Sequence, residues 1–81
     1  MYTVISEPIL VEAAFSSGKI TPRFFIWNRR KYRVEEITYF WRSKIGSAPI
    51  LHFAVTSYGS VYEISYNSKT SDWHLEKVYV E

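Results

Sequence analysis

The stretch ILHFAVTSYGSVYEISYN, residues 50–67, decides the fold class of this chain. Apolar and polar residues alternate on both sides of Tyr58-Gly59, which is the pattern of two half-buried strands joined by a tight turn. Because side chains alternate along a strand, a two-residue turn places six apolar residues on one face. The facing pairs are Val55 with Tyr62, Phe53 with Ile64, and Leu51 with Tyr66. The stretch therefore predicts an antiparallel hairpin with an apolar inner face.

The flanking sequence continues this pattern, and no long segment shows a 3.6-residue apolar repeat. Across the polar loop 67–71, the same register places Tyr66 opposite Trp73 and Ile64 opposite Leu75. We expect six strands, at residues 8–15, 20–27, 30–42, 50–57, 60–67 and 72–80. Chain reversals are expected where Gly, Asn and Pro occur, at 16–18, 28–29, 43–49 and 58–59.

The expected strand 30–42 changes its inward parity partway along. Tyr32 and Val34 are apolar on one parity, whereas Ile37, Tyr39 and Trp41 are apolar on the other. One extra residue at Glu35-Glu36 would explain the change as a β-bulge, which bends a strand and lets a small sheet curl. The sequence thus predicts an all-β fold, a six-stranded antiparallel meander curled into a small barrel-like sheet.

The composition sets the size of the core and excludes several classes of protein. Eighty-one residues form one domain, 1–81, and three Trp, seven Tyr and five Phe supply its core. Trp41 and Trp73 are expected to be buried. The chain has no cysteine for a disulfide framework, and it has no apolar run that resembles a signal peptide or a membrane span. A cytoplasmic location is expected.

Positive charge is concentrated in the middle of the chain. Residues 19–44 carry a net charge of +6, and the segments 1–18 and 45–81 carry −2 each. Proteins that bind single-stranded nucleic acid combine cations with stacking aromatic rings. The hairpin 23–33 contains both, so the candidate nucleic-acid site consists of Phe24, Arg29, Lys31 and Arg33. Alternatively, these charged side chains belong to a hairpin tip that is exposed to water and binds no partner.

The segment Phe24-Phe25-Ile26-Trp27 is apolar on both parities. A strand with two apolar faces must be covered on both of them. Because Phe25 is expected to face Tyr32 in the core, Phe24 and Ile26 form a candidate protein interface on the other face. A partner protein or a second copy would cover them, unless the strand 8–15 does so within the chain.

Catalytic and metal-binding patterns are weak. Glu35 and Glu36 are neighbours on a strand and point to opposite faces, and no P-loop, dinucleotide-binding or nucleophile-elbow motif occurs. His52 and His74 share an outer row with Ser65, but two strand spacings, roughly 10 Å, separate the histidines. We therefore expect a non-enzymatic chain without a metal site or a cofactor.

Spaced aromatic residues and one glycine carry a family resemblance. They are Pro22-Arg23-Phe24, Trp27, Arg30, Tyr32-Arg33-Val34, Trp41-Arg42, Phe53, Val55-Thr56, Gly59, Tyr62-Glu63-Ile64, Trp73, Leu75-Glu76 and Val78-Tyr79. Over residues 8–81 the chain resembles a family of small bacterial domains of unknown function, some of them fused to the C-terminus of Y-family DNA-polymerase-like proteins. The resemblance implies an all-β fold and an association with DNA maintenance, and it transfers no catalytic residue.

Two functions follow as expectations from these observations. The first is a protein-interaction module, for which the resemblance suggests a setting in DNA maintenance. The alternative is a module that binds single-stranded nucleic acid through the hairpin 23–33.

Overall fold

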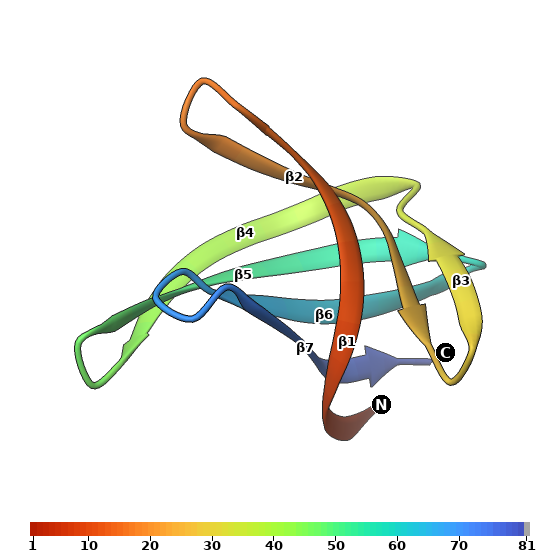
Figure 1. Ribbon diagram of the computed structural model, residues 1–81. Helices are drawn as coiled ribbons and strands as arrows, with labels where there is room; N and C mark the ends of the chain where they lie inside the picture. Colours follow the sequence, from red (N-terminus) through yellow and green to blue (C-terminus); the bar gives the residue numbers. More distant parts are fainter. Residues whose placement is uncertain (81) are drawn as a thin grey trace.

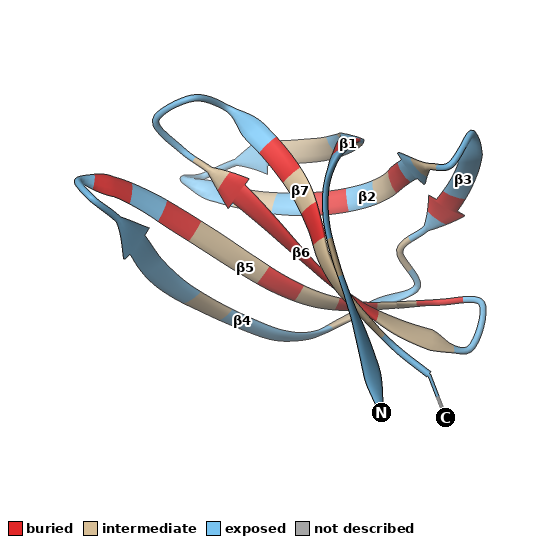
Figure 2. Cartoon of the chain, turned by 90° about the horizontal axis from the view of Figure 1, so that it is seen from below, coloured by how far each residue is buried: buried red, intermediate tan, exposed pale blue. Residues whose placement is uncertain are grey.

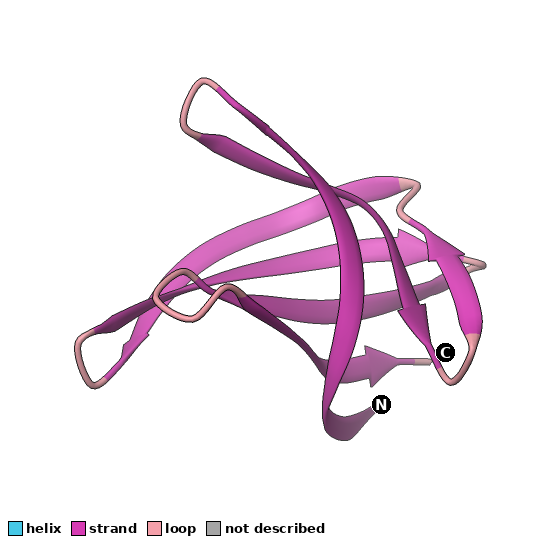
Figure 3. Ribbon diagram, viewed as in Figure 1, coloured by secondary structure: helices cyan, strands magenta, loops and turns pink. Residues whose placement is uncertain are grey.

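The computed structural model describes residues 1–80, and most of them lie in strands (Figures 1 and 3). Within that range the strands are β1 (Tyr2–Ser16), β2 (Lys19–Trp27), β3 (Arg30–Arg33), β4 (Glu36–Ile45), β5 (Ala48–Ser57), β6 (Ser60–Asn67) and β7 (Asp72–Tyr79). They form one antiparallel sheet in the order β3-β2-β1-β7-β6-β5-β4. The prediction of a curled all-β sheet is confirmed, with seven described strands in place of six. The sheet is not closed, because its edge strands β3 and β4 do not pair over residues 1–80.

Strand β1 is longer than the expected strand 8–15 and joins the two halves of the sheet. Its second half pairs with β2, and its first half pairs with β7 from Tyr2 opposite Tyr79 to Ile9 opposite Trp73. In Figure 1, β1 is the long curved ribbon that connects these two neighbours. The sequence did not predict residues 2–7 as a strand. Their register is interrupted between Val4 and Glu7, where Ser6 has a φ of 52°.

The expected strand 30–42 is two strands at opposite edges of the sheet. The chain leaves β3 at Val34, whose N–H donates to the Arg23 carbonyl at 2.9 Å. It enters the neighbourhood of β5 at Glu35, whose N–H donates to the Thr56 carbonyl at 2.9 Å. The predicted bend is therefore present. Its interpretation as a bulge within one strand is wrong, because the chain crosses here from one edge to the other.

A second irregularity moves Trp41 out of the core. The register between β4 and β5 shifts by one residue at Thr38. Beyond that point Phe40 takes the inward parity, and Trp41 lies opposite His52 on the outer face, where it is half-buried. The prediction that Trp41 belongs to the core is wrong. The same prediction for Trp73 is confirmed, since only 9% of its surface is exposed.

Tight turns fix the register of the hairpins. The residues of the Asn28-Arg29 turn have φ of 53° and 63°, and those of the Tyr58-Gly59 turn have φ of 48° and 77°. Positive φ at both central residues matches the twist of the flanking strands. The expected loose connection 43–49 is instead a two-residue turn at Gly46-Ser47, because Ile45 pairs directly with Ala48.

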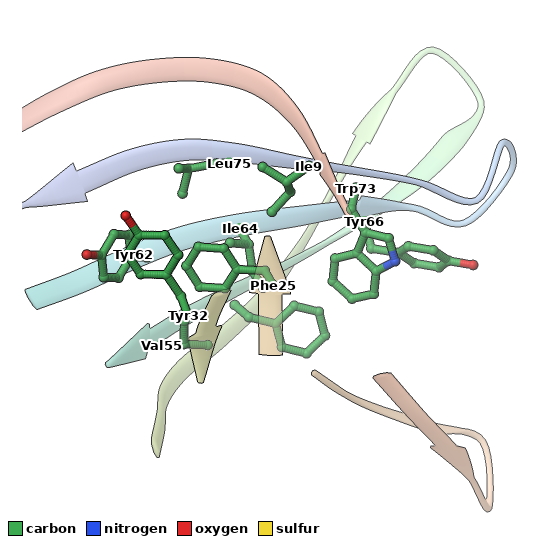
Figure 4. Close-up of a cluster of buried hydrophobic side chains, with 10 residues drawn as sticks. Ile9, Phe25, Tyr32, Val55, Tyr62, Ile64, Tyr66, Trp73 and Leu75 are labelled. Carbon is green, nitrogen blue, oxygen red and sulfur yellow. The ribbon is translucent and has the colours of Figure 1, made fainter. Parts of the chain in front are cut away.

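The core fills the concave side of the curled sheet (Figure 4). It consists of Ile9, Phe25, Tyr32, Phe53, Val55, Tyr62, Ile64, Tyr66, Trp73 and Leu75. The facing pairs predicted across β5, β6 and β7 are all present. In Figure 2 the buried residues are red. They make up much of β5, β6 and β7, whereas no residue of β4 is buried. No helix that could span a membrane is found in residues 1–80.

Candidate interaction surfaces

The hairpin formed by β2 and β3 carries an exposed group of cations. They are Arg29, Arg30, Lys31 and Arg33. The β2–β3 register places Phe24 opposite Arg33 and Ile26 opposite Lys31, so these four side chains share the outer face, as predicted. The Lys31 Nζ lies 4.0 Å from the centre of the Phe24 ring. A base that stacks on this face of Phe24 would therefore have to displace an ammonium group.

Acidic side chains stand among these cations. A hollow beside the hairpin is lined by Arg23, Phe24, Lys31 and Arg33, and also by Glu12, Glu35 and Glu36. Glu12 lies directly opposite Phe24 in the β1–β2 ladder. Nearby carboxylates lower the positive potential that would attract a phosphate. The structure thus gathers Phe24, Lys31 and Arg33 at one hollow, but this hollow has mixed charge.

An apolar pair, Leu10 and Ile26, lies on the same outer face. The two residues are direct partners in the β1–β2 ladder, and 71% and 38% of their surfaces are exposed. Strand β1 lies beside β2 in the sheet, so it does not cover the outer face of β2. Of the two predicted interface residues, Ile26 is exposed and Phe24 is half-buried.

The missing ladder between β3 and β4 leaves strand edges unpaired on both sides of the gap. We call the space between β4 and residues 19–22 of β2 the open seam. Among the described residues, β4 pairs with β5 alone, and β3 pairs with β2 only at residues 24–27. The outer edge of β4 and the edge of β2 at residues 19–22 are therefore free. In an antiparallel strand, alternate residues direct their N–H and C=O groups to such an edge, where another strand can bind them.

An apolar groove of ≈ 550 Å³ lies in the open seam. It is lined by Gly18, Lys19, Ile20 and Thr21 on one side and by Ile37, Phe40, Arg42, Leu51 and Phe53 on the other. Phe40 is 44% exposed, and its ring centre lies 5.2 Å from that of the buried Phe53. The Arg42 guanidinium lies over Phe40, with its Cζ 5.5 Å from the ring centre. The inner face of the sheet is thus accessible at the seam.

Irregular residues in β2 keep the seam open. The β1–β2 register shifts so that Arg23 is the extra residue of β2, and a bulge of this kind bends its strand. Pro22, just before it, has a ladder partner only in β1. Proline cannot donate to a ladder and therefore occurs where a strand has a free side. Pro22 is the one sequence signal that marks this edge, although the sequence pattern alone placed it inside an ordinary strand.

The outer face of β4–β7 carries the predicted row of His52, Ser65 and His74. The His52 ring is stacked on Trp41, with centroids 4.9 Å apart and planes 4° apart. Its Nε2 lies 2.7 Å from the Ser43 Oγ. His52 therefore holds the edge strand β4 against β5. No group of three His, Cys, Asp or Glu side chains that could hold a metal ion is found in residues 1–80.

A tyrosine cluster lies at the end of the sheet beside the basic hairpin. Tyr32, Tyr58 and Tyr62 line a second hollow together with Arg30 and Lys31. The ring centres of Tyr32 and Tyr62 are 5.3 Å apart, and those of Tyr32 and Tyr58 are 6.0 Å apart. Burial, and secondly the neighbouring Tyr32, raise the pKa of Tyr62, whereas a hydrogen bond with Ser60 and the charge of Arg30 oppose that rise. Sequence reasoning had assigned Tyr32 and Tyr62 to the core and Tyr58 to a turn, and it did not predict that the three would form a cluster.

Comparisons with known proteins returned no match among protein-family models, curated proteins or solved structures. The resemblance to small bacterial domains therefore stays a prediction.

Proposed function

We propose that this chain is a non-enzymatic protein-interaction module that binds an extended segment of another polypeptide in the open seam. The observation that supports the proposal is the coincidence of a free strand edge with an accessible apolar floor. An added strand would hydrogen-bond the edge of β4 and place alternate side chains against Phe40 and its neighbours. The family resemblance suggests DNA maintenance as the setting of this interaction.

The seam fits a polypeptide better than the outer face does. On the outer face, Leu10 and Ile26 belong to strands whose ladder is already formed, so a partner would gain only side-chain contacts there. At the seam, a partner would gain main-chain hydrogen bonds as well. The predicted interface residue Phe24 borders this site, because its hollow and the apolar groove share Thr21 and Ile37.

Peptide selection with a matched pair of variants tests the proposal. Octapeptides selected from a random displayed library should bind the wild-type chain and should fail to bind Phe40→Ser. They should still bind Tyr39→Ser, because Tyr39 is the exposed neighbour of Phe40 on the opposite face of β4. Circular dichroism would verify that both variants are folded. Selected peptides that bind Phe40→Ser as well as they bind the wild type would disprove the seam as the binding site.

Binding of single-stranded nucleic acid is the second candidate function. It is favoured by the exposure of the cations at the tip of the hairpin 23–33, which are Arg29, Arg30, Lys31 and Arg33. A site with three phosphate contacts should lose affinity roughly twentyfold between about 50 and 200 mM salt. Changing Lys31 and Arg33 together to Ala should flatten this dependence in fluorescence anisotropy with a mixed-sequence oligonucleotide. No binding at about 100 μM protein would exclude this function.

A further inference from the structure

We infer that the segment bound in the open seam is acidic, with carboxylate side chains opposite Arg42 and Lys44 and an apolar side chain opposite Phe40. This inference rests on the proposed function and adds the chemical class of the partner. It follows from three features of the seam: the charge of its walls, the register of β4 and the misfit of a second copy of the chain.

The charged side chains that line the apolar groove within residues 1–80 are all cationic. Lys19 stands on the β2 side and Arg42 on the β4 side, and the groove's lining within residues 1–80 contains no Asp or Glu. The adjoining hollow differs, because three glutamates line it. Both cations are exposed, and no carboxylate of the lining offsets their positive charge, so they would attract a carboxylate. An acidic segment would therefore prefer the apolar half of the seam.

The register of β4 sets where the acidic side chains would lie. The bulge at Thr38 interrupts the strand, so the regular edge runs from Tyr39 to Ile45 and measures roughly 23 Å. Phe40, Arg42 and Lys44 share its inward parity, because they lie opposite Phe53, Leu51 and Pro49 in turn. An added strand would follow the same alternation. Its inward side chains would thus meet one apolar and two cationic neighbours in succession.

A second copy of the chain is a poor occupant of the seam. If two β4 strands paired with each other, Arg42 and Lys44 of each copy would approach the same cations of the other copy. Like charges on one face of a strand pair are destabilising. The occupant that fits is therefore a different polypeptide that carries negative charge.

Two labelled probe peptides test the inference. Their sequences are Glu-Thr-Glu-Thr-Val-Thr and the reverse order, with blocked ends, because an added strand can run in either direction. Both glutamates and the valine then lie on one face of the added strand. We expect one of them to bind in fluorescence anisotropy, and the version with Lys in place of Glu to bind about tenfold more weakly through the loss of two ion pairs. Arg42→Glu should abolish this preference, because one of the two cations opposite the glutamates becomes an anion while Lys44 remains. Arg29→Glu is the control, since it makes the same charge change at the exposed hairpin tip.

Each remaining outcome contradicts the inference. Equal effects of Arg42→Glu and Arg29→Glu would show attraction by net charge rather than by the seam. Absence of binding by both acidic peptides at about 1 mM, near the weakest measurable affinity, would overturn the acidic partner. If library-selected neutral peptides still required Phe40, the proposed function would stand and this inference alone would fail. Self-association of the wild-type chain that Phe40→Ser abolishes would identify a second copy as the occupant.

Discussion

Replacing Trp73 with Ala tests whether the inner face of the sheet is the core. Trp73 is 9% exposed, and its ring centre lies 4.7 Å from that of Tyr66 and 5.9 Å from that of Phe53. Loss of a buried Trp side chain costs about 3–5 kcal/mol. At roughly 0.05–0.15 kcal/mol per residue, a domain of this size has about 4–12 kcal/mol of stability in total. The substitution should therefore remove a large share of that stability, and all of it if the domain lies at the lower end of this range.

Trp41→Ala is the matched control, because it removes the same side chain from the opposite face. Trp41 is half-buried and stacked on His52, so its loss should cost only about 1 kcal/mol, in line with the worth of an exposed aromatic pair. Urea unfolding followed by circular dichroism would give both values, provided that the m-value is unchanged. Iodide should quench the fluorescence of Trp41 and leave that of Trp73 largely protected. Equal destabilisation by the two substitutions would refute the assignment of faces.

Three further predictions concern turns and the tyrosine cluster. Arg29→Gly should raise the free energy of unfolding by about 0.5–1 kcal/mol in thermal melts, because Arg29 has a φ of 63° that glycine adopts without strain. Gly59→Ala should lower it by about 1 kcal/mol, since Gly59 has a φ of 77° although an added Cβ would meet no atom within 4 Å. The raised pKa of Tyr62 means that the unfolded chain loses this proton first, so stability should fall as pH rises above about 10. Tyr62→Phe should reduce that fall in urea midpoints measured between about pH 8 and 11; an unchanged slope would contradict it.

The hairpins β2–β3, β5–β6 and β6–β7 could be predicted from the sequence because their signals are local. Strict alternation and a turn residue that tolerates positive φ, such as Gly59, determine both the pairing and the faces. Trp41 could not be placed in this way, because Tyr39-Phe40-Trp41 is aromatic on both parities. Only the contact with β5 shows that the extra residue is Thr38. The first residues of β1 were missed because their partner, β7, lies at the other end of the chain.

The candidate site could be predicted only in part. The shared outer face of Phe24, Ile26, Lys31 and Arg33 follows from a single hairpin register, and the structure confirms it. The contact between the Lys31 ammonium and the Phe24 ring depends on side-chain conformation. The open seam depends on which two strands end up at the edges of the whole sheet. Apart from Pro22, no local sequence pattern indicates which strand edges stay unpaired.

The pairing of β1 with β7 brings the two ends of the chain together, so the ends could be joined and the chain opened at another point. The N–H of Val80 donates to the Met1 carbonyl at 3.1 Å, and Figure 1 shows the two ends side by side. A circular permutant that joins these ends and is opened between Val34 and Glu35 would run through the strands in their spatial order, from β4 through β7 and β1 to β3. Every ladder would then be a hairpin between consecutive strands. Because folding speeds up as contacts become more local, this permutant should fold faster than the original chain.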